Sequence, residues 1–390
     1  MIRRHAPRFL PGNHIELLHN GDEFFPALIA AIDQAECEVR LETYLFANDA
    51  IGRQVVGALA AAAQRGVTVK LLVDGFGAHN FMADFGERLM AAGVQVLVYR
   101  PEVSRFRLRR HRLRRLHRKL ATIDARIAFV GGINIIDDLD TPGQLPPRYD
   151  YSVRIEGPLL ADIHRVMRRL WYLVRWASLQ RRDPLRAPRP VTTCQEEGMT
   201  AALLIRDNLN HRHDIEEAYL SAIETARHDV LLANAYFLPG RRFRKALMAA
   251  ARRGVQVTLL LQGRAEYRLL YYATRAIYAD LLAAGVRIFE YRRGFLHAKV
   301  AVIDDDWATV GSSNIDPFSL LLAREANVVI RNGAFTAQLR DHLQQTLRTA
   351  SQEVTVATER RGPWGTRLLG RWAYALVRLL IELAGYGNRH

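Results

Sequence analysis

An internal duplication constrains the fold of this chain more than any other feature of its sequence. The run AAAQRGVTVKLL at 61–72 returns as AAARRGVQVTLL at 249–260, and LMAAGVQV at 89–96 returns as LLAAGVRI at 281–288. Each copy has the pattern of a helix end, a glycine stop signal and a β-branched strand. Two helix–strand units per half predict an α/β protein made of two similar domains, each an α/β/α sandwich.

The two copies are separated by a segment with the composition of a linker. Three prolines stand among charged residues between 179 and 200, and such stretches usually connect domains. A chain of 390 residues is long enough for two domains. The expected boundaries are a first domain over 1–178, a linker over 179–200, a second domain over 201–356 and a C-terminal segment over 357–390.

Each half also carries the same polar signature. The first copy is HRKLATID at 117–124 followed by GGIN at 131–134, and the second is HAKVAVID at 297–304 followed by GSSN at 311–314. The apolar residues predict strands, so alternation places each histidine and the lysine two residues later on one face. The turn-forming residues after each strand predict hairpins that return Asn134 and Asn314 toward the same site.

These residue types suit phosphodiester chemistry without a metal ion. One imidazole is a competent nucleophile at phosphorus near neutral pH. The other can protonate a leaving alkoxide and then deprotonate an incoming alcohol. Two lysines and two asparagines can hold the non-bridging oxygens and stabilise the charge of the transition state. We therefore expect no metal, no cofactor, and one active site at the interface of two domains related by a pseudo-twofold axis.

The paired signatures resemble those of the phospholipase D superfamily, and the resemblance extends from Gly12 to about Leu347. Four strings are most similar to bacterial cardiolipin synthases of type B, which lack N-terminal membrane spans: LHRK at 116–119, ANAYF at 233–237, FEYRR at 289–293 and VGSSNID at 310–316. This resemblance implies transfer of a phosphatidyl group from one phosphatidylglycerol to another through a phosphatidyl-histidine. The products would be cardiolipin and glycerol.

The resemblance also assigns roles to individual residues. The candidate catalytic residues are His117, Lys119, Asp124, His297, Lys299 and Asp304. Of these, the two aspartates are assigned mainly to structure, and Asn134 and Asn314 are the candidate phosphate-binding residues. A carboxylate after each motif is expected to orient an imidazole. Glu325 matches that pattern well, whereas Asp150 departs from it in residue type. His117 is the expected nucleophile and His297 the expected acid/base, although spacing leaves their order open.

The charge of the chain points to a polyanionic partner. Lys and Arg number 55 against 40 Asp and Glu, which gives a net charge of +15; such a surface attracts nucleic acid or an anionic bilayer. An insertion before the first motif is rich in arginines that we expect to bind lipid headgroups, with a solvated basic loop as the alternative: Arg105, Arg107, Arg109, Arg110 and Arg112. The two cysteines fit a reducing compartment.

The C-terminal stretch from Thr366 to Gly385 has the pattern of an amphipathic helix. Charged residues recur on one face, and leucines with Trp372 fill the rest. That pattern is typical of a helix lying in a bilayer surface, and packing on the core is the alternative. We find no run of about 18 apolar residues and no signal peptide. These features predict a peripheral protein on the cytoplasmic face of the bacterial inner membrane.

Two other activities within the same superfamily remain open. A hydrolase of the phospholipase D type uses water in place of an alcohol acceptor, and no residue in the sequence reports that choice. A nuclease shares the motifs and the basic surface, but we see none of the aromatic stacking platforms expected for single strands, so nucleic acid is not an expected partner. Phosphatidylglycerol is the expected substrate, and the sequence leaves the oligomeric state unknown.

Overall fold

The computed structural model describes residues 7–101, 114–141, 145–178, 197–207, 210–264, 268–316, 319, 323–357 and 364–383. The first repeat contains β1 (Leu10–His19), α1 (Asn20–Asp33), β2 (Glu38–Thr43), α2 (Ala50–Gln64), β3 (Thr68–Asp74), η1 (Met82–Gly86), α3 (Glu87–Ala91), β4 (Gln95–Tyr99), β5 (Lys119–Ile123), β6 (Ile127–Gly131), β7 (Arg148–Tyr149), β8 (Tyr151–Glu156) and α4 (Leu160–Ala177).

The second repeat follows the same order, except that its two-residue strand precedes the signature strand instead of following the hairpin. It contains β9 (Met199–Arg206), α5 (Asp214–Thr225), β10 (Asp229–Asn234), α6 (Arg241–Arg252), β11 (Gln256–Gln262), α7 (Arg268–Arg275), α8 (Tyr278–Ala283), β12 (Arg287–Tyr291), β13 (Phe295–Leu296), β14 (Lys299–Ile303), β15 (Trp307–Gly311), β16 (Glu325–Arg331) and α10 (Gly333–Ala350). Two further elements follow it: β17 (Ser351–Val354) and α12 (Trp364–Leu383). Because β9 begins at Met199, the second repeat starts inside the segment expected to be linker.

One sheet of 15 strands runs through both repeats, in the order β17-β12-β11-β10-β14-β15-β16-β9-β1-β8-β6-β5-β2-β3-β4. Outward from β1 and β9 the order is the same in both directions as far as β4 and β12, as a twofold relation between the repeats requires, and β17 is added at the edge of the second repeat. The expected α/β class and duplication are thus confirmed. The sheets of the two repeats are joined, however, because the antiparallel pair β1–β9 connects them. That pairing covers two edges that would otherwise expose free backbone groups.

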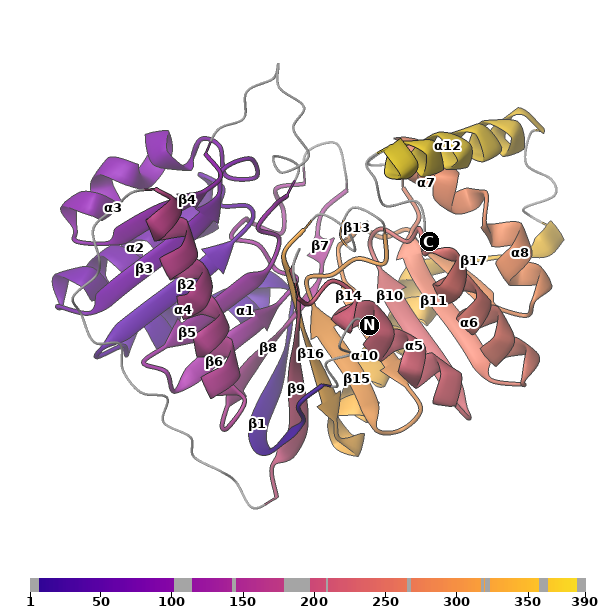
Figure 1. The fold of residues 1–390 in the computed structure, drawn as a ribbon, viewed down its shortest axis with the longest axis horizontal. Helices are drawn as coiled ribbons and strands as arrows, with labels where there is room; N and C mark the ends of the chain where they lie inside the picture. The colour runs from indigo at the N-terminus through magenta and orange to yellow at the C-terminus, as the bar shows by residue number, and fades with distance from the viewer. Residues whose placement is uncertain are drawn as a thin grey trace.

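Helices cover both faces of this sheet (Figure 1). One apolar cluster joins α1, α2 and α3 to the first repeat, and another joins α5, α6 and α8 to the second. A third cluster contains side chains of β6 and β8 together with β15, β16, α4 and α10. This third cluster lies at the junction of the repeats, where it fixes one repeat against the other.

The C-terminal helix α12 lies across α7 (Figure 1). Its inner side packs through Ala373 and Val377 against Leu238 and Ala273. Its outer side exposes five large apolar residues: Leu368, Leu369, Trp372, Leu376 and Leu379. The sequence left two environments open for this helix, and it contacts the core on one side while presenting an apolar row on the other. Among the helices of the described ranges, none is long and apolar enough to cross a membrane.

Candidate active site

The two signature strands meet where short β-pairings cross between the repeats. Leu116, which precedes the first histidine, pairs with Arg324 of the second repeat, and the N–H of His117 donates to the carbonyl of Arg324 at 3.0 Å. The second histidine has the same arrangement: β13 pairs with β7 of the first repeat, and the N–H of His297 donates to the Tyr149 carbonyl at 2.8 Å. Each histidine is therefore anchored on the opposite repeat.

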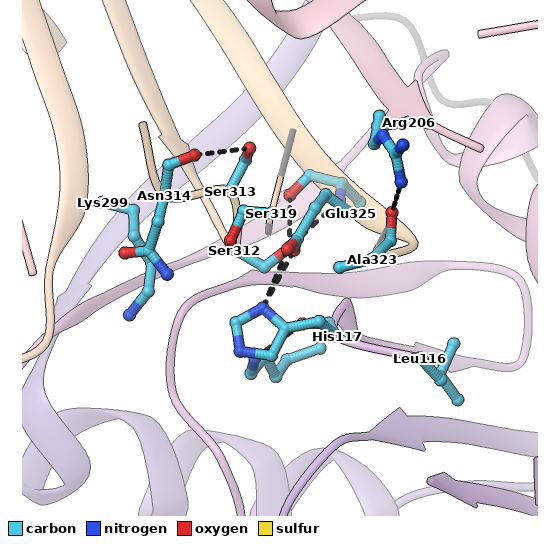
Figure 2. A network of polar contacts seen from close by, with 12 residues as sticks. Leu116, His117, Arg206, Lys299, Ser312, Ser313, Asn314, Ser319, Ala323 and Glu325 are labelled. Carbon is cyan, nitrogen blue, oxygen red and sulfur yellow. Dashed lines mark hydrogen bonds and ion pairs between the residues drawn. The ribbon is translucent and has the colours of Figure 1, made fainter. Parts of the chain in front are cut away.

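His117 is oriented by Glu325, a residue of the second repeat. Its Nδ1 lies 3.0 and 3.1 Å from the two carboxylate oxygens. The hydroxyl of Ser312 donates to the same carboxylate at 2.6 Å, and Glu325 is fully buried. In Figure 2 the dashed contact runs from the ring of His117 to Glu325. A proton on Nδ1 satisfies the carboxylate and leaves the Nε2 lone pair available for attack.

His297 is oriented by Asp150, a residue of the first repeat. The N–H of Tyr151 donates to Oδ1 of the aspartate at 2.9 Å, and Nδ1 of His297 lies 2.5 Å from Oδ2. The ammonium of Lys299 lies 3.5 Å from the same oxygen. Although burial acts in the opposite direction, Lys299 and His297 hold the pKa of Asp150 below its usual value. This carboxylate therefore stays charged and fixes the ring.

Both signature lysines are buried beside the imidazoles, as the strand alternation predicts. Lys119 donates to the carbonyl of His117 at 2.6 Å, and Lys299 donates to the carbonyl of His297. Burial, with a further contribution from Lys299, lowers the pKa of Lys119 to about 7. Burial lowers the pKa of Lys299 to about 8. Buried ammonium groups of this kind attract a phosphate anion, whose charge restores their own protonated state.

The two imidazoles are poised in the neutral form. Burial lowers the pKa of His117, and the neighbouring Glu325 opposes that shift while Lys119 adds to it. Burial, together with Lys299, lowers the pKa of His297 to about 3. Lys299 also contributes to the shift at His117, so the charges of the second motif act on the imidazole of the first. A neutral imidazole is the form that attacks phosphorus.

The two signature asparagines take equivalent places. The carboxamide oxygen of Asn134 accepts from the N–H of Leu45 at 3.1 Å, and that of Asn314 accepts from the N–H of Tyr236 at 3.4 Å. Both residues are buried. Figure 2 shows Asn314 beside Lys299 on the side of the site that His117 faces. These bonds occupy each carboxamide oxygen, so the NH2 group is the part of each asparagine that the predicted phosphate-binding role would use.

The two signature aspartates lie away from this site, so they do not belong in the catalytic set. Asp124 and Asp304 stand at the far ends of β5 and β14, about 20 Å along the strand from each histidine. Asp124 accepts from three backbone N–H groups, those of Glu36, Cys37 and Glu38, at 2.7 to 2.8 Å. Asp304 accepts from Arg227, His228 and Asp229 at 2.8 to 3.1 Å. Both fasten a hairpin turn to the start of a neighbouring strand.

Sequence reasoning missed two supporting residues that differ between the copies. Ser312, which supports Glu325, has Gly132 as its counterpart in the first repeat. A Cβ atom at Gly132 would lie only 2.3 Å from an oxygen of Asp150. The available signal was that the two motifs, which otherwise match, have serine at this position in one copy and glycine in the other. The expected headgroup-binding arginines Arg105, Arg107, Arg109, Arg110 and Arg112 lie outside the described residues.

A duplicated sheet that brings two histidine–lysine strands to one buried site defines a phosphotransfer enzyme of the phospholipase D type. The family described as "Cardiolipin synthase, PLD-like domain" matches the chain at residues 28–170 and 219–347. The chain therefore belongs to the cardiolipin synthase family of the phospholipase D superfamily, which confirms the resemblance drawn from the motifs.

Individual relatives agree with this assignment. The chain is 39% identical to cardiolipin synthase B of Escherichia coli K12, over 97% of this chain and 91% of that protein. It is 33% identical to cardiolipin synthase of Geobacillus kaustophilus, over 80% and 62% respectively. Among solved structures, phosphatidylserine synthase of Haemophilus influenzae superposes with a TM-score of 0.71 at 15% identity, covering 95% of each chain. That likeness supports the fold alone.

Proposed function

We propose that this protein transfers a phosphatidyl group from one phosphatidylglycerol to another and releases glycerol. The single observation that carries this proposal is the crossed pair of imidazole–carboxylate contacts, Glu325 to His117 and Asp150 to His297. Two oriented imidazoles divide the roles of nucleophile and acid/base, as a double displacement at phosphorus needs. The relatives named cardiolipin synthase supply the substrate class.

In the first step, Nε2 of His117 attacks the phosphorus of the donor lipid. A P–N bond forms, the P–O bond to the glycerol headgroup breaks, and His297 gives its proton to the leaving alkoxide. Lys119, Lys299 and the two asparagine carboxamides stabilise the negative charge that develops on the non-bridging oxygens. For this step His297 must be protonated, and the bound phosphodiester anion favours that form by raising the low pKa of its imidazole.

In the second step, a hydroxyl of the acceptor phosphatidylglycerol attacks the phosphatidyl-histidine. The new P–O bond forms, the P–N bond to His117 breaks, and His297 takes the proton of the hydroxyl. Cardiolipin leaves, and both imidazoles return to their starting state. Water in place of the lipid alcohol would give phosphatidic acid, so the acceptor decides between a synthase and a hydrolase.

The experiment mixes the purified protein with phosphatidylglycerol vesicles, with and without a chelator, and separates the products by chromatography. We expect cardiolipin and glycerol in equal amounts, and the same rate with the chelator. Phosphatidic acid alone would identify a hydrolase. Cleavage of an oligonucleotide with no lipid product would identify a nuclease, and either result contradicts the proposal.

The assignment of His117 as the nucleophile and His297 as the acid/base needs its own test. In the variant His297→Ala the intermediate forms slowly and is no longer resolved by an acceptor, so phosphatidylglycerol labelled in its acyl chains leaves label on the protein. We expect that label on the peptide containing His117. A label on any other peptide contradicts the proposed order.

The proposal includes peripheral binding at the cytoplasmic face of the inner membrane, where the substrate lies. The outer side of α12 supports it, because Trp372 is 69% exposed within a row of leucines whose opposite side is packed on α7. Arg371 is exposed on the same helix, and the net charge of the chain is +15. An amphipathic basic helix with an exposed tryptophan fits an anionic lipid surface.

A further inference from the structure

The two repeats differ at the last residue of equivalent strands. Asp74 ends β3 and Gln262 ends β11, and the glycine after each donates its N–H to a tyrosine carbonyl of the next strand. In the first repeat the Asp74 carboxylate is fully used, since it accepts from the N–H groups of Leu116, Phe76 and Gly77 at 2.8 to 3.1 Å. It thereby fixes the segment that leads into His117.

Gln262 has no such partners. It is only 8% exposed, yet neither its amide nitrogen nor its amide oxygen has a hydrogen-bond partner among the described residues. A buried amide left without partners costs free energy, so a native protein seldom keeps one unless a ligand or water satisfies it. Gln262 is therefore a polar residue at the position of Asp74 that does not hold a neighbouring segment as Asp74 does.

Gln262 is one of the residues that line a cavity of about 30 Å³. The other lining residues include Ala235, Tyr236, Tyr271 and Arg264. Ala235 donates its N–H to the carbonyl of Ala298, beside His297, and Tyr236 donates to Asn314. Two residues that line the cavity are thus hydrogen-bonded to residues of the second motif. Since a water molecule needs roughly 10–15 Å³ of such space, the cavity has room for about two hydroxyl-sized groups.

We propose that this cavity binds the vicinal diol of the glycerol headgroup, with Gln262 holding the hydroxyl that does not react. This inference rests on the proposed function. It adds that the cavity determines which alcohol the enzyme uses as acceptor. One diol hydroxyl attacks phosphorus while the P–N bond to His117 breaks, and its proton passes to His297. The neighbouring hydroxyl donates to the Gln262 amide oxygen and accepts from the amide nitrogen. The leaving glycerol of the donor lipid occupies the same position in the first step.

Competition between two small alcohols tests the site. The full chain acts on phosphatidylglycerol vesicles with equal concentrations of 1,2-propanediol and 1-propanol, and the two phosphatidyl products are separated. Both alcohols compete for the same phosphatidyl-enzyme, so the ratio of the two products is independent of how fast that intermediate forms. We expect the wild-type protein to favour the diol by about tenfold, the effect of one hydrogen-bonded hydroxyl. Equal use of the two alcohols would overturn the site while leaving transfer intact.

Two variants complete the test. Gln262→Met keeps the length of the side chain and removes the amide, so we expect the product ratio to fall to about one. Gln256→Met makes the same change at the exposed start of β11 and should keep the wild-type ratio. A Gln262→Met protein that still prefers the diol contradicts the inference. If the wild-type protein makes no cardiolipin and no product with either small alcohol, the proposed function itself fails.

Discussion

Nδ1 of His117 lies 3.0 Å from a carboxylate oxygen of Glu325, which is 208 residues further along the chain. Asp150 and His297 make the reciprocal contact across 147 residues. Each repeat therefore supplies an imidazole that only the other repeat can orient. The duplicated sequence yields one active site, because neither copy holds a complete imidazole–carboxylate pair.

The crossed carboxylates should control the rate of the chemistry. We expect Glu325→Gln and Asp150→Asn each to lower kcat by at least about 100-fold, because a carboxamide no longer fixes the imidazole tautomer or stabilises the imidazolium. KM for phosphatidylglycerol should change little, since neither residue is placed against the lipid. Initial rates of cardiolipin formation measure both constants.

A surface carboxylate provides the control for these variants. Glu353 forms an exposed ion pair with Arg287 at 2.9 Å, so Glu353→Gln should leave kcat unchanged. If either crossed-carboxylate variant kept more than a third of the wild-type kcat, the orienting role assigned to that residue would be wrong.

The buried lysines predict an activity that falls at moderately alkaline pH. A lysine carries its charge below its pKa, so the ammonium groups of Lys119, with a pKa of about 7, and Lys299, with a pKa of about 8, are lost as the pH rises through those values. At low pH the imidazole of His117 protonates, and its lowered pKa places that loss below pH 6.5. We expect kcat/KM to show a bell-shaped profile between these limits.

Substitution by arginine separates the lysine effect from the others. A guanidinium stays charged throughout this pH range, so Lys119→Arg should move the alkaline limb of kcat/KM upward even if the maximum rate is lower. Lys245→Arg, at an exposed position of α6, should leave the profile unchanged. An alkaline limb at the same pH in Lys119→Arg and in the wild-type protein would show that Lys119 does not set it.

The outer side of α12 predicts the strength of membrane binding. Trp372→Glu places a charge in the middle of the apolar row, and we expect at least tenfold weaker binding to phosphatidylglycerol vesicles in a sedimentation assay. Met90→Glu is the matched control, because Met90 is 53% exposed on α3, far from α12 in Figure 1. Equal loss of binding in both variants would mean that net charge, and not α12, controls the association.

Local patterns in the sequence predicted much of this molecule. The hairpins β5–β6 and β14–β15 follow from the turn-forming residues between their strands. The shared face of each histidine and lysine follows from strand alternation, and both signals are encoded in neighbouring residues. Pairing between β1 and β9 leaves no such trace, because it depends on two segments almost 190 residues apart. For the same reason the sequence named Glu325 and Asp150 but gave no sign that each serves the histidine of the other repeat.

The supporting roles of Ser312 and Gly132 could not be predicted from the sequence for a different reason. Ser312 and Gly132 occupy one position of a matched motif, but their meaning depends on the length of the carboxylate that each must accommodate. The longer Glu325 leaves space for a hydroxyl that donates to it. The shorter Asp150 lies so close to the backbone that a side chain at position 132 would collide with it. Such a relation is visible only when both segments are in place.

This contact makes Gly132 a sharp test of the site. In Gly132→Ala the new Cβ would lie 2.3 and 2.6 Å from the two oxygens of Asp150, a residue that is only 1% exposed. The carboxylate must move, so we expect the variant to lose at least about 100-fold in kcat, as Asp150→Asn does, and about 1–3 kcal/mol of unfolding free energy from the forced shift. Gly57→Ala is the control, because no atom lies within 4 Å of a Cβ there and alanine favours helix α2 by about 1 kcal/mol. Cardiolipin formation and thermal unfolding are measured on both variants. A Gly132→Ala protein as active as Gly57→Ala would mean that Asp150 can leave its position while His297 stays correctly oriented.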